Sequence, residues 1–222
     1  MEARLTGVRR QEMLRYLHYR GEKLTDTMEA DLTRCEEMVL AAARPRAVWR
    51  LFPLEECGDA STAAFSPEGE SVRRLLTGCH SLILFAATLG SEIDLLIQRT
   101  QHRNMGDALM IDAASSAAIE NVCDNLCADL AEQMTPDFLT DRFSPGYGDF
   151  PLRQQADFFR VLDITRKIGV TLTDSGLMIP QKTVTALIGV SKQPQTKRGR
   201  DCESCSLFPG CSFQKEGKHC AE

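Results

Sequence analysis

The sequence predicts an α+β fold, in which helices pack around a twisted, mainly antiparallel sheet, with a helical N-terminal segment and a cysteine-rich tail. Three observations lead to this prediction. Apolar residues recur at helical spacing in some segments, as in Met28, Leu32 and Cys35. Other apolar runs are short and end at glycine or proline, which is typical of strands. The two kinds of segment do not alternate regularly, which argues against a parallel α/β sheet.

The first half of the chain contains both kinds of segment. Helices are expected over residues 8–20, 25–43 and 66–78. β-like segments are expected at Pro45–Glu56, at Ser61–Phe65 and in the apolar run "LILFAATL" (Leu82–Leu89), which suits a buried strand ended by Gly90.

The second half begins with two helices, expected over residues 91–103 and Met105–Met134, the second stopped by Thr135-Pro136. A further helix is expected over Leu152–Gly169, with Gly169 as its C-cap. Residues 170–191 then read as three short strands, with turns at Asp174–Gly176 and at Pro180.

Composition narrows the class of protein. The chain has 222 residues, of which 43% are hydrophobic, so it can bury a sizeable core. Its net charge of −5 argues against a general nucleic-acid binder, which normally carries a basic face. No apolar run reaches the roughly 18 residues of a membrane span. The charged N-terminus lacks the apolar core of a signal peptide. We therefore expect a cytoplasmic protein without nucleic-acid or membrane partners.

The segment "RFSPGYGDFP" (Arg142–Pro151) carries more turn residues than a turn needs. Gly146 and Gly148 allow a ligand to approach the backbone closely. Arg142 offers a planar fork for a carboxylate, and Tyr147 offers an aromatic face that attracts cations. These groups together suit a small zwitterionic or sulfonium ligand. The alternative is an elaborate structural turn, with Arg142 in a surface ion pair.

This segment resembles "R-P-A-P-G-Y-P" of the activation domain of cobalamin-dependent methionine synthase, a module that binds S-adenosylmethionine. "LTDSGLMIPQKTVTALIGVS" (Leu172–Ser191) is similar to a second stretch of that family, and "AAIENVCDNLCADLAEQM" (Ala117–Met134) resembles its ligand-facing helix. The resemblance implies an S-adenosylmethionine-binding core (76–191), preceded by an N-terminal segment (1–75). Composition separates a basic linker (192–200) and the cysteine-rich tail (201–222) from this core.

The resemblance implies five ligand-binding residues: Arg142 for the ligand carboxylate, Glu120 for its amino group, and Ser144, Gly146 and Tyr147 in the loop. Ser144 stands where the family has an alanine that contacts the ligand through its backbone. An aspartate near the start of the family's domain has no match here.

Asp174 and Ser175 correspond to another family position. They either line the site or only form a turn, and the turn is favoured.

The implied function is reactivation of cobalamin that has been oxidised to an inactive state. S-adenosylmethionine would supply a methyl group to cobalamin bound on a partner, while an electron donor such as flavodoxin or ferredoxin reduces the cobalt. No catalytic acid or base is implied, because the sulfonium is already a good leaving group. The chain is too short to hold a cobalamin module as well. The expected partner is therefore a separate corrinoid-binding methionine synthase or related methyltransferase chain. The alternative is a non-catalytic docking module for such a protein.

The last 21 residues contain Cys202, Cys205, Cys211 and Cys220. Four thiolates that begin with a C-x2-C pair fit a tetrahedral zinc site or an iron–sulfur cluster. His219 in place of Cys220 and a disordered tail are the alternatives. An iron–sulfur cluster could deliver an electron, whereas a zinc ion would stabilise a small folded segment that docks on a partner.

Overall fold

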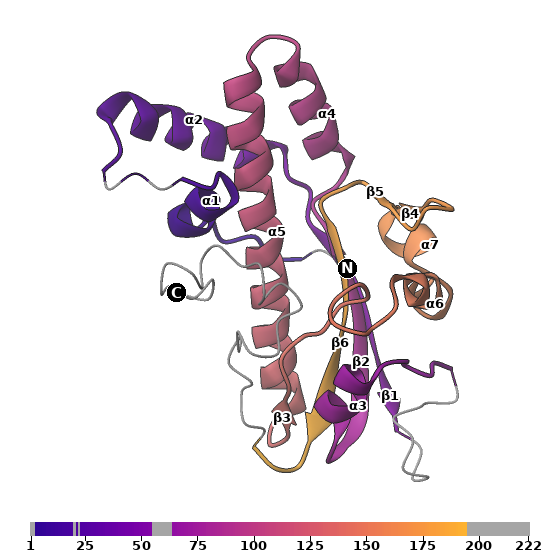
Figure 1. Ribbon diagram of the computed structural model, residues 1–222. Helices are drawn as coiled ribbons and strands as arrows, with labels where there is room; N and C mark the ends of the chain where they lie inside the picture. The colour runs from indigo at the N-terminus through magenta and orange to yellow at the C-terminus, as the bar shows by residue number, and fades with distance from the viewer. Residues whose placement is uncertain (1–2, 20, 22, 55–63, 195–222) are drawn as a thin grey trace.

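The computed structural model describes residues 3–19, 21, 23–54 and 64–194. The chain forms, in order, the helices and strands α1 (Arg10–Tyr16), α2 (Asp26–Ala42), β1 (Arg46–Pro53), α3 (Glu70–Leu76), β2 (Cys79–Thr88), α4 (Ser91–Gln101), α5 (Met105–Met134), β3 (Phe138–Leu139), a 3-10 turn (Leu152–Gln154), α6 (Gln155–Leu162), α7 (Ile164–Ile168), β4 (Thr171–Leu172), β5 (Met178–Ile179) and β6 (Thr183–Ser191) (Figure 1).

The main sheet has four strands in the order β1-β2-β6-β3, and every neighbouring pair is antiparallel. Phe85 of β2 lies at the centre, paired with Trp49 of β1 and with Ala186 of β6. The short strands β4 and β5 form a separate antiparallel hairpin. The prediction of an antiparallel sheet inside an α+β fold is confirmed.

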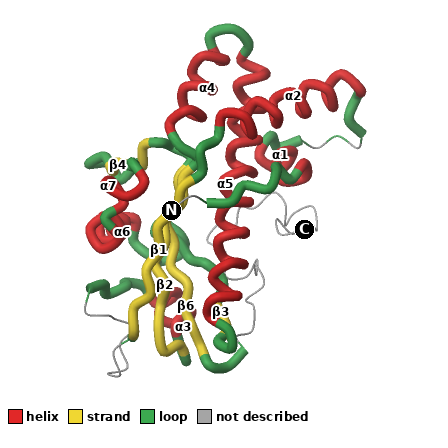
Figure 2. The backbone as a smooth tube through the Cα atoms, turned by 180° about the vertical axis from the view of Figure 1, so that it is seen from behind, coloured by secondary structure: helices red, strands yellow, loops and turns green. Residues whose placement is uncertain are grey.

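Two hydrophobic cores lie on opposite faces of the sheet. Along β2, Ile83, Phe85 and Ala87 point into the core beneath α5, whereas Leu82 and Leu84 point into the core beneath α3, α6 and α7. The period-2 alternation of a strand explains this division. Since both faces are covered, β2 reads as a continuous apolar run (Figure 2).

The long helix α5 organises one side of the molecule. It begins where the side chain of Asn104 accepts hydrogen bonds from the backbone N–H groups of Gly106 and Asp107 (2.9 and 3.3 Å). Ala114 and Ala118 are fully buried in the core shared with the sheet, so small side chains let the helix pack closely. The helices α1, α2 and α4 lie against the same helix (Figure 1).

Two expectations about secondary structure were wrong. The helix expected over 152–169 is broken at Asp163, whose φ of 55° is left-handed, so α6 and α7 are separate helices. Asparagine and aspartate tolerate this conformation, which explains the missing sequence signal. Of the strand expected at Ser61–Phe65, residues 61–63 lie outside the described part of the chain, and Phe65 lies outside any strand. Gly169 caps α7 as expected, with φ 71°.

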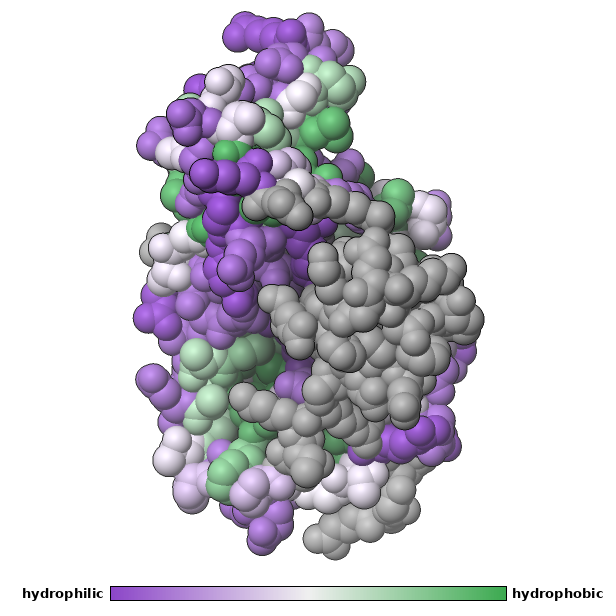
Figure 3. Space-filling model, turned by 60° about the vertical axis from the view of Figure 1, so that its left-hand side comes forward, coloured by the Kyte–Doolittle hydropathy of each residue, from purple (hydrophilic) through white to green (hydrophobic). Residues whose placement is uncertain are grey.

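Within the described residues, no helix combines the length and apolar character needed to cross a membrane. On the side of the molecule shown in Figure 3, the surface that is not drawn in grey is largely hydrophilic.

Candidate functional site

The loop Arg142–Pro151 leaves β3 and runs back across the sheet. Phe143 exchanges two backbone hydrogen bonds with Leu187 of β6, both 2.9 Å. The loop then closes on itself, because the N–H of Gly146 donates to the carbonyl of Phe150 at 2.8 Å and the N–H of Tyr147 donates to that of Ser144 at 3.2 Å. The backbone N–H groups of Gly146 and Tyr147 are therefore used within the loop.

The two loop glycines adopt backbone angles that other residues avoid. The φ of Gly146 is 92° and that of Gly148 is 54°. A Cβ atom at Gly148 would also lie 3.3 Å from the hydroxyl of Ser71. A residue with a Cβ atom would therefore be strained at either position.

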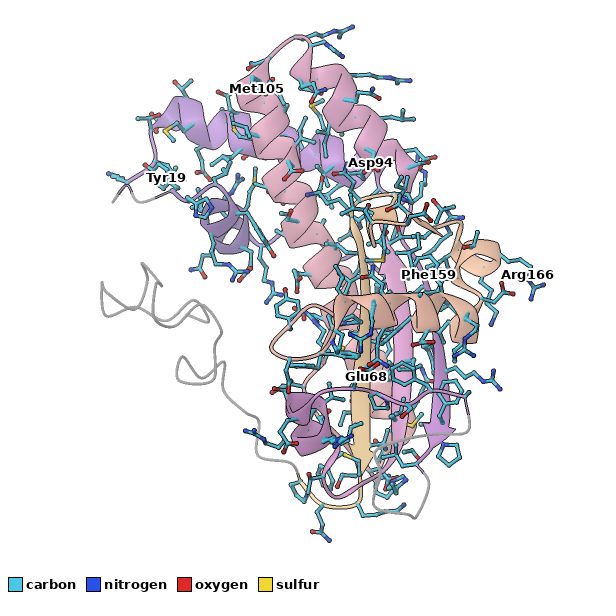
Figure 4. The ribbon with its side chains drawn as sticks, turned by 45° about the vertical axis from the view of Figure 1, so that its right-hand side comes forward. Tyr19, Glu68, Asp94, Met105, Phe159 and Arg166 are labelled. Carbon is cyan, nitrogen blue, oxygen red and sulfur yellow. The ribbon has the colours of Figure 1, made fainter. Side chains whose placement is uncertain are left out.

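The C-terminal end of the loop and the turn after it are attached to the start of α3 and to the segment before it. The carboxylate of Asp149 accepts hydrogen bonds from the N–H groups of Glu70 and Ser71, at 2.6 and 3.0 Å. The buried amide of Gln154 bonds to the N–H of Glu68 at 2.7 Å. In Figure 4, Glu68 is labelled on this segment, below α6. The shape of the loop therefore depends on contacts with α3 and with the segment before it, on the same face of the sheet.

Asp149 supplies the N-cap that α3 cannot provide for itself, since Gly69 occupies the cap position and has no side chain. Hydrogen bonds from Ser71 and from the helix N–H groups lower the pKa of Asp149. A carboxyl whose pKa is lowered in the folded state adds stability above its unfolded pKa of about 3.9, and that stability is lost as the pH falls through the lowered value.

We therefore expect Asp149→Ala to reduce the free energy of unfolding by about 1 kcal/mol at pH 7, the usual effect of losing a cap. The difference from the wild type should shrink as the pH falls through the lowered pKa of Asp149, because the wild-type carboxyl is then also protonated. Urea unfolding at pH 7 and over a series of acidic pH values measures this. Asp149→Asn is the control, because its amide oxygen still accepts; an equal loss in Asn and Ala variants would contradict the capping role.

Arg142, at the start of the loop, reaches the side of α5. Its guanidinium donates to the carboxylate of Glu120 and, at 2.6 Å, to that of Asp124. The side chains of Arg142 and Glu120 are only 20% and 27% exposed. Burial disfavours the charged guanidinium, but these carboxylates help to raise the pKa of Arg142 on balance. The structure thus brings together the two charged residues expected to bind a zwitterion.

Two of the other predicted residues lie further along the same loop. Ser144 is partly buried, and the Tyr147 side chain is 67% exposed at the tip of the loop. The Thr173 hydroxyl closes the "TDS" turn, since it accepts from the N–H of Leu177 at 3.0 Å and lies 2.9 Å from the Ser175 hydroxyl. This agrees with the turn favoured for Asp174 and Ser175.

Sequence reasoning missed three residues that the structure places beside the pair. Asp124 is shared by Arg142 and Arg9. Tyr16 of α1 lies close enough to Glu120 for that charge to help raise its pKa, after burial as the larger cause. Asp124 follows Glu120 by one helical turn, which is a usable signal. Arg9 and Tyr16 come from the N-terminal segment, in which no sequence pattern indicated a binding residue.

A second polar cluster lies where β2 begins. His80 lies between the hydroxyl of Ser81 and the carboxylate of Asp137, both at 3.0 Å, and Lys192 binds Asp137 at 2.9 Å. No sequence pattern groups these residues. The cluster joins the start of β2 to the residue before β3 and to the residue after β6. We therefore interpret its role as structural.

The free cysteines of the described core behave as small hydrophobic residues. Cys35 and Cys123 are fully buried, and burial raises the pKa of both thiols. Burial also raises the pKa of Cys79 to about 11. The predicted metal ligands Cys202, Cys205, Cys211 and Cys220 lie outside the described residues. Among the described residues, no group of histidine, cysteine or acidic side chains could hold a metal ion.

Fold and site together define an α+β domain in which a long helix crosses an antiparallel sheet and a glycine-rich loop carries an arginine to two helix carboxylates. The family model "Vitamin B12 dependent methionine synthase, activation domain" matches residues 77–197. The chain belongs to this family, as the resemblance of the loop and the last strands implied. A comparison with curated proteins found no match.

A comparison with solved structures supports the same fold. The chain is similar to the structure described as the MetH reactivation domain bound to AdoHcy, with a TM-score of 0.58 and 16% sequence identity. The match covers 98% of this chain and 88% of the other. The structural similarity therefore extends beyond the family match, to residues before position 77.

Proposed function

We propose that this activation domain binds S-adenosylmethionine at the Arg142–Glu120 pair and presents its methyl group to a cobalamin on a corrinoid-binding methionine synthase or related methyltransferase chain. The observation that carries the proposal is the pair itself, in which a cation and a carboxylate meet at a partly buried junction of loop and helix. Family membership supports the reaction, and the similar reactivation domain bound to AdoHcy supports the ligand class.

The pair has the charges that a zwitterionic amino acid requires. The carboxylate of such a ligand matches the fork of Arg142, and its ammonium group matches the carboxylate of Glu120. Binding would therefore replace one internal ion pair by two ion pairs with the ligand. Asp124, the second partner of Arg142, would keep a counter-ion because it also pairs with Arg9.

The proposed step needs position more than acid or base chemistry. Cobalamin on the partner would supply the reduced cobalt that accepts the methyl group. The domain must hold the ligand so that its methyl carbon faces that metal, because small misplacements slow a group transfer severely. The positive φ of Gly146 and Gly148, together with the attachment of the loop by Asp149, supports a fixed ligand position.

Calorimetric titration of the purified protein with S-adenosylmethionine tests this proposal. Saturable one-site binding that methionine alone reproduces only weakly is the expected result. Absence of binding would favour the alternative, a docking module that has the fold without the ligand. A donor such as flavodoxin or ferredoxin would complete the system, and reductive methylation of a partner's cobalamin is the functional assay.

We further propose that the four cysteines of residues 202–220 bind one zinc ion or one iron–sulfur cluster, on the basis of their number and spacing. Anaerobic purification followed by metal analysis is expected to give one zinc per chain, or iron with a cluster absorbance. Cys205→Ser should lower the metal content strongly, whereas Cys79→Ser in the core should not. A chain that binds no metal would contradict the proposal.

A further inference from the structure

Both terminal nitrogen atoms of the Arg142 guanidinium are held by carboxylates of the same chain. Its Nη1 atom donates to Asp124 at 2.6 Å, and its Nη2 atom donates to Glu120. These two nitrogen atoms form the end of the fork on which a ligand carboxylate makes a bidentate pair. A ligand carboxylate can therefore take both positions only after Asp124 and Glu120 have released them.

The two carboxylates differ in what replaces the arginine when it is released. Under the proposed function, Glu120 exchanges Arg142 for the ammonium group of the ligand. Asp124 has no such replacement in the ligand, but its second oxygen already pairs with Arg9 of the N-terminal segment. Without a ligand, Asp124 thus occupies a position that the ligand carboxylate needs, and it has a second cation to which it can remain bound.

Arg9 is held beside α5 by the residues that precede it. The backbone N–H and the hydroxyl of Thr6 both donate to the side-chain oxygen of Asn121 at 3.0 Å. The side-chain amide of Asn125 donates to the carbonyl of Arg4, also at 3.0 Å. Both asparagines belong to α5, the helix that carries the shared aspartate, so these bonds do not involve the loop. The second cation is therefore fastened independently of the loop arginine.

We propose that Asp124 is an internal competitor for the ligand carboxylate, which lowers the affinity of the site for amino-acid ligands, and that Arg9 weakens this competition by holding the other oxygen of Asp124. This inference rests on the proposed function. Binding then exchanges one carboxylate for another on the same arginine. Any ligand that presents an amino-acid carboxylate to Arg142 meets this competition, whatever the charge of its sulfur.

The competition predicts opposite effects for the two partners of one ion pair. Asp124→Asn removes the competing charge, so ligand affinity should rise. Arg9→Gln leaves Asp124 to Arg142 alone, so ligand affinity should fall. The side chain of Asp124 is 41% exposed, and ion pairs of this exposure change an equilibrium by roughly two- to fivefold. A general effect of charge has the reverse signs, because S-adenosylmethionine carries a net positive charge that Asp124 attracts and Arg9 repels.

Calorimetric titration of the full chain with S-adenosylmethionine and with S-adenosylhomocysteine tests this inference. Both ligands should bind roughly two- to fivefold more tightly in Asp124→Asn and more weakly, by a similar factor, in Arg9→Gln. S-adenosylhomocysteine has the same carboxylate but no net charge, so a general effect of charge would leave its affinity nearly unchanged. In the double variant, Arg9→Gln should have no further effect, because the competitor on which it acts is gone.

Asp129→Asn and Arg4→Gln are the matched controls. Asp129 also lies on α5, its side chain is 44% exposed, and it pairs with Arg4 at 2.7 Å. This second ion pair likewise joins the start of the chain to the helix, but it does not include Arg142. Both control variants should therefore bind the two ligands with the affinity of the wild type.

Unchanged or weaker binding in Asp124→Asn would overturn this inference while leaving the proposed function intact. Unchanged or tighter binding in Arg9→Gln would do the same, as would a gain in Asp129→Asn equal to that in Asp124→Asn. If the wild type bound neither ligand, the proposed function itself would fail, and this inference with it. Far-UV circular dichroism and urea unfolding of each variant show whether it is folded before its affinities are compared.

Discussion

Replacing Arg142 by glutamine is expected to weaken S-adenosylmethionine binding by about 30-fold or more. Truncating one partner of a desolvated charge pair typically costs about 2 to 5 kcal/mol, and about 1.4 kcal/mol corresponds to a factor of ten. Arg142 is 20% exposed and is the arginine that the loop carries to Glu120. Arg142→Lys keeps the charge but loses the planar fork, so we expect an intermediate loss of about tenfold or more.

Arg153→Gln provides the matched control for this experiment. Arg153 also pairs with a glutamate, Glu68, but at the other end of the loop, where its side chain is 67% exposed. Exposed ion pairs of this kind contribute little free energy. The affinity of the Arg153→Gln variant for the ligand should therefore match that of the wild type. Unchanged affinity in Arg142→Gln would contradict the proposed site. A similar loss in both variants would indicate a general effect of positive charge.

Replacing Phe150 by alanine is expected to lower the free energy of unfolding by about 3 to 5 kcal/mol, the usual range for a buried phenylalanine. Phe150 is 1% exposed and ends the loop inside the second core. Its ring stacks against Phe143 at a centroid distance of 6.2 Å and lies 6.4 Å from Phe158. Removing it leaves a cavity at the point where the loop is anchored.

Urea unfolding followed by circular dichroism measures this effect. Phe138→Ala is the control, because Phe138 is 41% exposed on the edge strand β3 and its loss should cost much less. Comparable destabilisation by the two substitutions would show that the loop is not anchored by its aromatic end. In that case the loop would derive its shape from Asp149 and Gln154 alone.

The sequence predicted those elements whose signals are local. The bounds of α5 were predicted correctly because Asn104 caps its start and Thr135-Pro136 stops it. The strand β2 was recognisable because both of its faces are buried and its apolar run is therefore unbroken. The break at Asp163 carried no comparable signal, since an aspartate in the left-handed region looks like any polar residue of a helix surface.

The candidate site was predictable only in part, because its contacts depend on tertiary structure. The loop pattern pointed to Arg142 and Tyr147 as binding residues. That Arg142 meets Glu120 and Asp124 depends on how the loop returns to α5 after β3. The proximity of Tyr16 to Glu120 depends on the packing of α1 against a helix a hundred residues away in the chain, which no local pattern encodes.

The carboxylate of Asp124 connects two parts of the chain that are remote in sequence, since Arg9 and Arg142 both bind it. A ligand that draws Arg142 away would leave Asp124 to Arg9 alone and would hold the start of the chain more firmly. Coupling between two binding events is reciprocal. Any contact that orders the first residues, a docked partner included, would thus raise ligand affinity by the same factor. Ligand binding at Arg142 and the ordering of the chain around Arg9 would then be coupled through Asp124.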